Sequence, residues 1–135
     1  MNSEKVPNPT VLVVDDEALI RWSLSEGLSD GGYAARMAGS GAEARAALED
    51  LVDQPLVILL DLRLPDVADL SLLEDIRTKR PDAPVIMMTA HGTPDDAVRA
   101  KALGARHFVG KPFDVGEMVA LVATTWQQHL AQTLP

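Results

Sequence analysis

The 135-residue sequence contains no cysteine and no apolar run as long as a membrane helix. Without cysteine there are no disulfide bonds and no thiolate metal ligands, which is compatible with the reducing cytoplasm where we expect the protein to work. A membrane span needs about 20 consecutive apolar residues, so no membrane association is expected. Residues 1–9 lack the apolar segment of a secretory signal, and we interpret them as a polar lead-in.

Basic side chains are also scarce. The sequence has 12 Lys and Arg against 20 Asp and Glu, a net charge of -8 at pH 7. Because nucleic-acid binding depends largely on neutralising phosphates with Lys and Arg, no direct binding to nucleic acid is expected. The hydrophobic fraction of 47% and charged fraction of 24% are ordinary for a globular domain, and the length suffices for one core without disulfides.

Apolar β-type runs alternate with helical patterns five times along the chain. Strands are predicted at residues 10–15, 33–39, 56–61, 84–90 and 106–112, and helices at 18–28, 40–51, 70–79, 94–104 and 115–130. The strands are continuously apolar, which predicts an α/β fold with a parallel sheet covered by helices on both faces. We therefore expect one domain over residues 10–130, with 131–135 as a tail or the start of a linker.

Local signals support two of the predicted helices. Ser40 followed by Glu43 predicts a capping box at the start of the second helix. Pro94 in the first turn and Gly104 after the last turn mark the two ends of the fourth helix.

Polar side chains stand where the predicted strands end. In open parallel sheets, ligands bind outside the carboxyl ends of the strands, so these side chains are predicted to meet at one edge. They are Asp15 and Asp16 after the first strand, Asp61 at the end of the third, Thr89 near the end of the fourth and Lys111 after the fifth.

Three carboxylates at one edge require a cation. Two unit charges about 4 Å apart repel by about 1 kcal/mol in water and about 4 kcal/mol at an effective dielectric constant of 20. Oxygen ligands favour Mg²⁺ or Ca²⁺, and a shallow site with few carboxylates favours Mg²⁺, which retains waters and accepts phosphate oxygens. Lys111 would offset charge and hold an anion, and we predict a cis peptide bond between Lys111 and Pro112.

Each of these residues taken alone has a simpler interpretation. Asp15 and Asp16 could cap the helix that follows them. Thr89 could be an ordinary β-branched strand residue, and a lysine before proline could be a turn residue. The combination with Asp61 on a neighbouring strand favours a site.

Asp15-Asp16, Asp61, Thr89 and Lys111, in that order on five βα units, resemble the receiver domain of bacterial two-component response regulators. The resemblance covers roughly residues 10–130 and implies a flavodoxin-like sheet with strand order 2-1-3-4-5. The segments "MMTAHGTPDDAV" and "GARHFVGKPFD" are most similar to receivers of nitrogen-regulation, enhancer-binding activators. In such proteins an ATPase domain and a DNA-binding domain follow the receiver.

The resemblance implies a role for each site residue. Asp61 would accept a phosphoryl group from a sensor histidine kinase. Magnesium would be held by Asp16, Asp61 and the backbone carbonyl of Arg63, with Asp15 acting through water. The domain would signal rather than turn over a substrate, catalysing only its own phosphotransfer and autodephosphorylation.

The resemblance also implies contacts to the phosphoryl group and an output. Lys111, Thr89 and the backbone of Leu62 and Ala90 would contact the phosphoryl group. Thr89 and Phe108 would form the switch. The fourth helix, fifth strand and fifth helix would form the face of a possible homodimer.

Two departures from the family pattern stand out. Asp69 occupies a position where many relatives have glycine, so the loop after the third strand is expected to be shaped differently, with a further negative charge near the site. Phe108 replaces a tyrosine and keeps the ring without the hydroxyl. Arg63 and His91, each two residues beyond a site residue, are hypothesised to tune the lifetime of the phosphorylated state.

Three alternatives remain open. A degenerate receiver would act only as a protein-binding module, if Asp69 disrupts the loop. A haloacid-dehalogenase-type phosphatase also uses an aspartate at a strand end, but it needs a second aspartate two residues later, where this chain has Arg63. A flavin-mononucleotide binder needs a phosphate loop after the first strand, where Asp15 and Asp16 would repel phosphate.

Overall fold

The computed structural model describes residues 7–90 and 92–133. Five parallel strands form one sheet in the order β2-β1-β3-β4-β5, as predicted. The strands are β1 (Thr10–Val14), β2 (Ala35–Ala38), β3 (Leu56–Asp61), β4 (Val85–Thr89) and β5 (His107–Gly110). The helices are α1 (Ala18–Asp30), α2 (Gly41–Asp50), α3 (Ser71–Lys79), α4 (Pro94–Ala102) and α5 (Val115–Thr133). No helix in the described part of the chain is long and apolar enough to cross a membrane.

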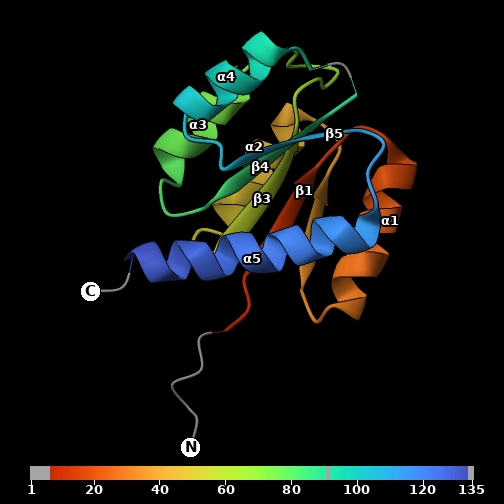
Figure 1. Ribbon diagram of the computed structural model, residues 1–135, viewed down its shortest axis with the longest axis vertical. Helices are drawn as coiled ribbons and strands as arrows, with labels where there is room; N and C mark the ends of the chain where they lie inside the picture. Colours follow the sequence, from red (N-terminus) through yellow and green to blue (C-terminus); the bar gives the residue numbers. More distant parts are fainter. Residues whose placement is uncertain (1–6, 91, 134–135) are drawn as a thin grey trace, which may run out of the picture.

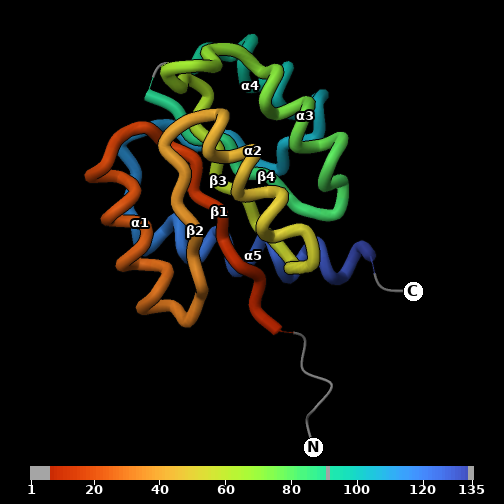
Figure 2. The backbone as a smooth tube through the Cα atoms, turned by 180° about the vertical axis from the view of Figure 1, so that it is seen from behind, coloured from red at the N-terminus to blue at the C-terminus, as the bar shows by residue number. Residues whose placement is uncertain are grey.

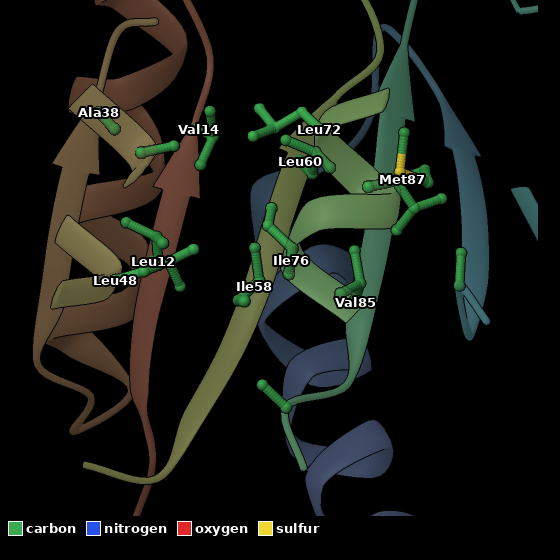
Figure 3. Close-up of a cluster of buried hydrophobic side chains, with 14 of the residues drawn as sticks. Leu12, Val14, Ala38, Leu48, Ile58, Leu60, Leu72, Ile76, Val85 and Met87 are labelled. Carbon is green, nitrogen blue, oxygen red and sulfur yellow. The ribbon is translucent and has the colours of Figure 1, made fainter. Parts of the chain in front are cut away.

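Helices cover both faces of the sheet, as Figures 1 and 2 show from opposite sides. Side chains that alternate along each strand build two cores. Leu12, Ile58 and Met87 point to the face covered by α2, α3 and α4 (Figure 3). Val13 and Leu59 point to the opposite face, where α1 and α5 pack. Because full burial of one such side chain contributes about 1.5–3 kcal/mol, the central strands give the carboxyl edge of the sheet a rigid base.

Polar caps fix the starts of α2 and α4. Half of the predicted capping box at α2 forms, because the Ser40 hydroxyl accepts from the Glu43 backbone N–H at 3.1 Å. The Glu43 carboxylate accepts from the N–H of Gly39 at 2.7 Å rather than from that of Ser40. A complete capping box joins Thr93 and Asp96 at the start of α4. Gly104 follows the end of that helix with φ of 104°, a conformation that favours glycine.

The loop between β3 and α3 is attached to the start of α2. Both carboxylate oxygens of Asp66 accept backbone N–H groups, from Gly41 at 2.8 Å and from Ala42 at 3.0 Å. These hydrogen bonds lower the pKa of Asp66. An acceptor at the N-terminal end of a helix is favourable because those N–H groups have no partner within the helix. The loop that follows Asp61 is therefore attached to the start of α2 through Asp66.

Asp69 fits this loop without the conformation that glycine would allow. No non-glycine residue in the described part of the chain has positive φ. The Asp69 carboxylate instead accepts from the backbone N–H of Ser71 at 3.0 Å, at the start of α3. Hydrogen bonds from Ser71 lower the pKa of Asp69. The charge of Asp69 is thus directed to the start of a helix.

A largely buried arginine joins three segments at the opposite edge of the sheet. The Arg80 guanidinium donates to the backbone carbonyls of Leu51 at 3.1 Å and Gln54 at 2.7 Å, and it pairs with Asp82 at 2.9 Å. Arg80 itself is 7% exposed. It therefore connects the end of α3 to the turn that leads into β3.

Replacing Arg80 with Met should lower the free energy of unfolding by about 1–3 kcal/mol, because two carbonyls lose their donor in a partly buried position. Urea denaturation measures the change. The control is Arg36→Met, which removes an exposed ion pair with Asp50 and should change the free energy of unfolding by about 1 kcal/mol or less. Equal effects of the two substitutions would contradict the role given to Arg80.

Candidate functional site

The carboxyl ends of β1 and β3 lie side by side in the middle of the sheet. Val14 pairs with Leu60, so the residues that follow β1 lie beside the end of β3. β2 lies on one side of β1, whereas β3, β4 and β5 follow on the other side. The strand order therefore reverses direction between β1 and β3, and open α/β sheets bind ligands at such a switch point. Here Asp15, Asp16 and Asp61 each bring a carboxylate oxygen within 4.8 Å of the others.

Lys111 lies at the same edge, as predicted. Its ammonium nitrogen is 2.7 Å from Asp15 Oδ2, 3.0 Å from Glu17 Oε1 and 3.2 Å from Asp61 Oδ2. The Lys111 side chain is 7% exposed, so these contacts are only partly screened by water. The peptide bond between Lys111 and Pro112 is cis, as predicted.

Burial and charge compete at this edge. Burial raises the pKa of Asp61, while the hydrogen bond from the Arg63 N–H and the charge of Lys111 act in the opposite direction without cancelling it. Burial alone would lower the pKa of Lys111, but its contacts with Asp15 and Glu17 and the charge of Asp61 outweigh burial and raise it. One ammonium group is therefore shared among carboxylates that it does not fully neutralise.

The residues present fit an oxygen-liganded divalent cation. Asp15 Oδ2 is buried and has no hydrogen-bond partner, so its contact with the Lys111 ammonium is an ionic one. Asp16 adds another carboxylate to the group, and no cation besides Lys111 is seen in contact with the three among the described residues. All three donors are carboxylate oxygens, which are the ligands of Mg²⁺ and Ca²⁺.

The loop after β1 is held by hydrogen bonds on several sides. The Asp15 N–H donates to the carbonyl of Ala38 at 3.0 Å, and the Arg21 guanidinium donates to the carbonyl of Asp15 at 2.8 Å. Asp15 Oδ1 accepts from the Glu17 N–H at 2.8 Å. Asp15 does not cap α1, because the N-cap residue is Glu17 and no side chain caps that helix. One Asp15 oxygen stabilises the turn before the helix, and the other faces Lys111.

A pocket of about 370 Å³ opens over the carboxylates. Its wall consists of Asp16, Glu17, Asp61, Arg63, Thr89, Ala90 and Lys111. Six of these seven residues are charged or hydroxyl-bearing, and two of the charged groups are cationic. The pocket can therefore admit a small anion beside Asp61.

Backbone groups near Asp61 are already engaged. The Arg63 N–H donates to Asp61 Oδ1 at 3.2 Å. The Leu62 N–H donates to the carbonyl of Met88 at 3.1 Å, as part of the contact between β3 and β4. The predicted contact of Leu62 with a phosphoryl group would have to replace that bond.

The residues of the predicted switch lie next to each other. A methyl group placed on Gly92 would come within 2.5 Å of the Thr89 Cγ2 and 2.6 Å of the Phe108 ring. Thr89 is buried, and Phe108 is partly buried against the core shared with α2, α3 and α4. His91, the other candidate in this loop, lies outside the described residues.

Three contributors were not predicted as site residues. Glu17 contacts Lys111 through its carboxylate. Arg21 and Asp66 hold the loops that carry the carboxylates. The only signal for Glu17 in the sequence was its place directly after two acidic residues, and nothing distinguished Arg21 or Asp66 from other surface charges.

Comparison with known proteins agrees with this geometry. Residues 11–123 match the family model described as the response regulator receiver domain. The chain is 41% identical over 125 residues to the DNA-binding transcriptional regulator NtrC of Escherichia coli (strain K12), covering 93% of this chain and 26% of NtrC. It therefore spans about a quarter of the length of that relative.

Two solved structures extend the comparison. The beryllofluoride-activated NtrC4 receiver domain dimer is 37% identical, with a TM-score of 0.81 over 89% of this chain and 98% of that chain. A CheY-like receiver domain protein from Methanospirillum hungatei JF-1 has a TM-score of 0.86 at 24% identity, over 93% of this chain and 99% of that chain, and supports the fold alone. The chain belongs to the response regulator receiver domain family.

Proposed function

We propose that the chain is a phosphoacceptor receiver in which Asp61 takes a phosphoryl group from a histidine kinase. The observation that carries the proposal is the pairing of Asp61 with Lys111 at 3.2 Å beside two further carboxylates. Phosphoryl transfer needs positioning and charge stabilisation rather than complex covalent chemistry. A lysine, an oxygen-rich cation site and an anion-sized pocket supply both.

In the reaction, an Asp61 carboxylate oxygen forms a bond to phosphorus as the bond between phosphorus and the imidazole nitrogen of phosphohistidine breaks. The leaving imidazole keeps the bonding electron pair. Bound Mg²⁺, held by Asp16, Asp61 and the Arg63 carbonyl with Asp15 through water, would neutralise charge on the phosphoryl oxygens. The charge of Lys111 favours the ionised form of Asp61 and would bind a phosphoryl oxygen, and Ala90 and Thr89 border the same pocket.

Incubation with Mg²⁺ and acetyl phosphate should add one phosphoryl group to the protein, detected by intact-mass spectrometry. Asp61→Asn should abolish the addition, because the amide oxygen is a poor nucleophile. Asp53→Asn, in the exposed turn after α2, should label like the wild type. Chelation of Mg²⁺ should suppress labelling without unfolding the chain.

The other outcomes identify the alternatives. Complete absence of labelling in the folded wild type would indicate a receiver that acts only as a binding module. Repeated release of phosphate from a small substrate would favour a phosphatase, although Arg63 occupies the place of that family's second aspartate. The influence of Arg63 on the lifetime of the phosphorylated state remains a prediction, as does that of His91.

A kinase that delivers phosphorus to Asp61 must cover the surface around the pocket. An exposed apolar surface lies on α1, where Leu19 is 72% and Trp22 is 62% exposed. Beside them is an apolar pocket of about 180 Å³ between α1 and the segment after β5, lined in part by Leu19, Lys111 and Phe113. We therefore assign the docking of the kinase's phosphohistidine domain to this surface.

Leu19→Ser should slow phosphotransfer from a phosphorylated histidine kinase by roughly tenfold or more, because a leucine buried in the contact contributes about 1.5 kcal/mol or more. The rate with acetyl phosphate should stay unchanged, since that donor needs no docking surface. Val52→Ser is the control: Val52 is 62% exposed but lies after α2, at the opposite edge. An equal loss with both donors would contradict the assignment.

The proposed output face consists of α4, β5 and α5, and its use as a homodimer interface follows the dimer reported for NtrC4. Val98 on α4 is 68% exposed. In a longer regulator, the receiver unit of residues 10–130 would act in the cytoplasm on ATPase and DNA-binding domains, and it would not touch DNA itself.

Phosphorylation should shift the protein from monomer to dimer in size-exclusion chromatography with light scattering. Val98→Arg should weaken the dimer by at least about tenfold, because it places a charge in an apolar contact. Val52→Arg should leave the equilibrium unchanged. A phosphorylated protein that stays monomeric at high concentration would exclude this output.

A further inference from the structure

Glu17 differs from the other two carboxylates that contact Lys111. Asp15 and Asp61 are 0% and 6% exposed, whereas the Glu17 side chain is 56% exposed. The contact of Glu17 Oε1 with the Lys111 ammonium at 3.0 Å is the one hydrogen bond seen for that carboxylate within residues 7–90 and 92–133. The Glu17 carboxylate thus contacts the cluster through the Lys111 ammonium.

We propose that Glu17 restrains Lys111 in the unphosphorylated protein and competes with the phosphoryl group for its ammonium. Glu17 is then a positioning residue that sets how tightly the site holds an anion on Asp61. The inference rests on the proposed function of Asp61 as phosphoacceptor.

The Lys111 ammonium is already crowded in the unphosphorylated protein. A lysine ammonium has three N–H donors; this one donates to Glu17 at 3.0 Å and to Asp61 at 3.2 Å, and it lies 2.7 Å from Asp15 in an ionic contact. A phosphoryl oxygen that approaches Lys111 therefore competes with these carboxylates for the same ammonium.

Glu17 is the partner that can be released at the lowest cost. Separating Lys111 from Asp15 would leave a buried carboxylate without its counter-charge, which is strongly destabilising. Asp61 carries the phosphoryl group and must stay beside Lys111. Glu17 is largely exposed, so water can replace the lysine at its carboxylate.

Glu17 is not placed as a metal ligand. The group of carboxylates whose oxygens lie within 4.8 Å of one another consists of Asp15, Asp16 and Asp61. Glu17 instead lines the pocket beside Lys111, where an entering anion would meet the pair. Its effect should therefore appear in anion binding rather than in cation binding.

The test compares beryllofluoride binding at saturating Mg²⁺ in the whole chain, followed by ¹⁹F NMR. Glu17→Gln should bind beryllofluoride about two- to five-fold more tightly, the range expected for the loss of one exposed ion pair. Mg²⁺ affinity measured without fluoride should change less than the anion affinity. Glu117→Gln, which removes an exposed carboxylate in the first turn of α5, should bind beryllofluoride like the wild type.

A second background separates competition from simple charge repulsion. In Lys111→Met protein, adding Glu17→Gln should no longer improve beryllofluoride binding, because the shared partner is gone. An improvement of the same size in that background would overturn the proposal, as would weaker anion binding in Glu17→Gln alone. Failure of the wild type to bind beryllofluoride would instead count against the phosphoacceptor function itself.

Discussion

The site depends on one lysine that holds together carboxylates that would otherwise repel one another. At about 4 Å each pair of like charges costs about 4 kcal/mol at an effective dielectric constant of 20. The parallel sheet imposes this crowding, because β1 and β3 are adjacent and deliver Asp15 and Asp61 to the same edge. Lys111, reaching in from beyond β5, offsets part of the repulsion. The repulsion that remains is the electrostatic basis for the proposed binding of a divalent cation.

Buried charges are fully paired at the amino edge of the sheet and incompletely paired at the carboxyl edge. At the amino edge, Arg80 is matched by two carbonyls and a carboxylate, and the arrangement serves stability. At the carboxyl edge, Asp15 Oδ2 lacks a hydrogen bond and burial raises the pKa of Asp61. Such imperfect satisfaction is typical of functional sites, where local stability is lost in favour of chemistry. The neighbouring loops compensate, since Arg21 and Asp66 fasten them to the rest of the molecule.

The fold and the main site residues were predictable from the sequence. Continuous apolar strands and βα alternation define the sheet, and the sheet defines which residues share an edge. Asp15, Asp16, Asp61 and Lys111 were therefore placed together correctly. The contact of Glu17 with Lys111 was not predictable, since it joins residues 94 positions apart through side-chain conformations that no local pattern encodes. The hydrogen bond from the Ser71 N–H to Asp69 at the start of α3 was likewise not predictable, and whether Asp69 reshapes its loop relative to other receivers stays a prediction.

The packing of Thr89 and Phe108 suggests how the proposed phosphorylation of Asp61 would change the structure on the far side of β4 and β5. Thr89 and Phe108 belong to adjacent strands and border the same small space at Gly92. Because that space cannot hold even one extra methyl group without displacing a neighbour, a movement of Thr89 towards the pocket changes the room available to the ring. A packed interior responds to such a change by shifting between discrete arrangements. Phe108 has no hydroxyl to bind at the surface, so in the proposed switch packing alone would carry the signal to the face of α4, β5 and α5.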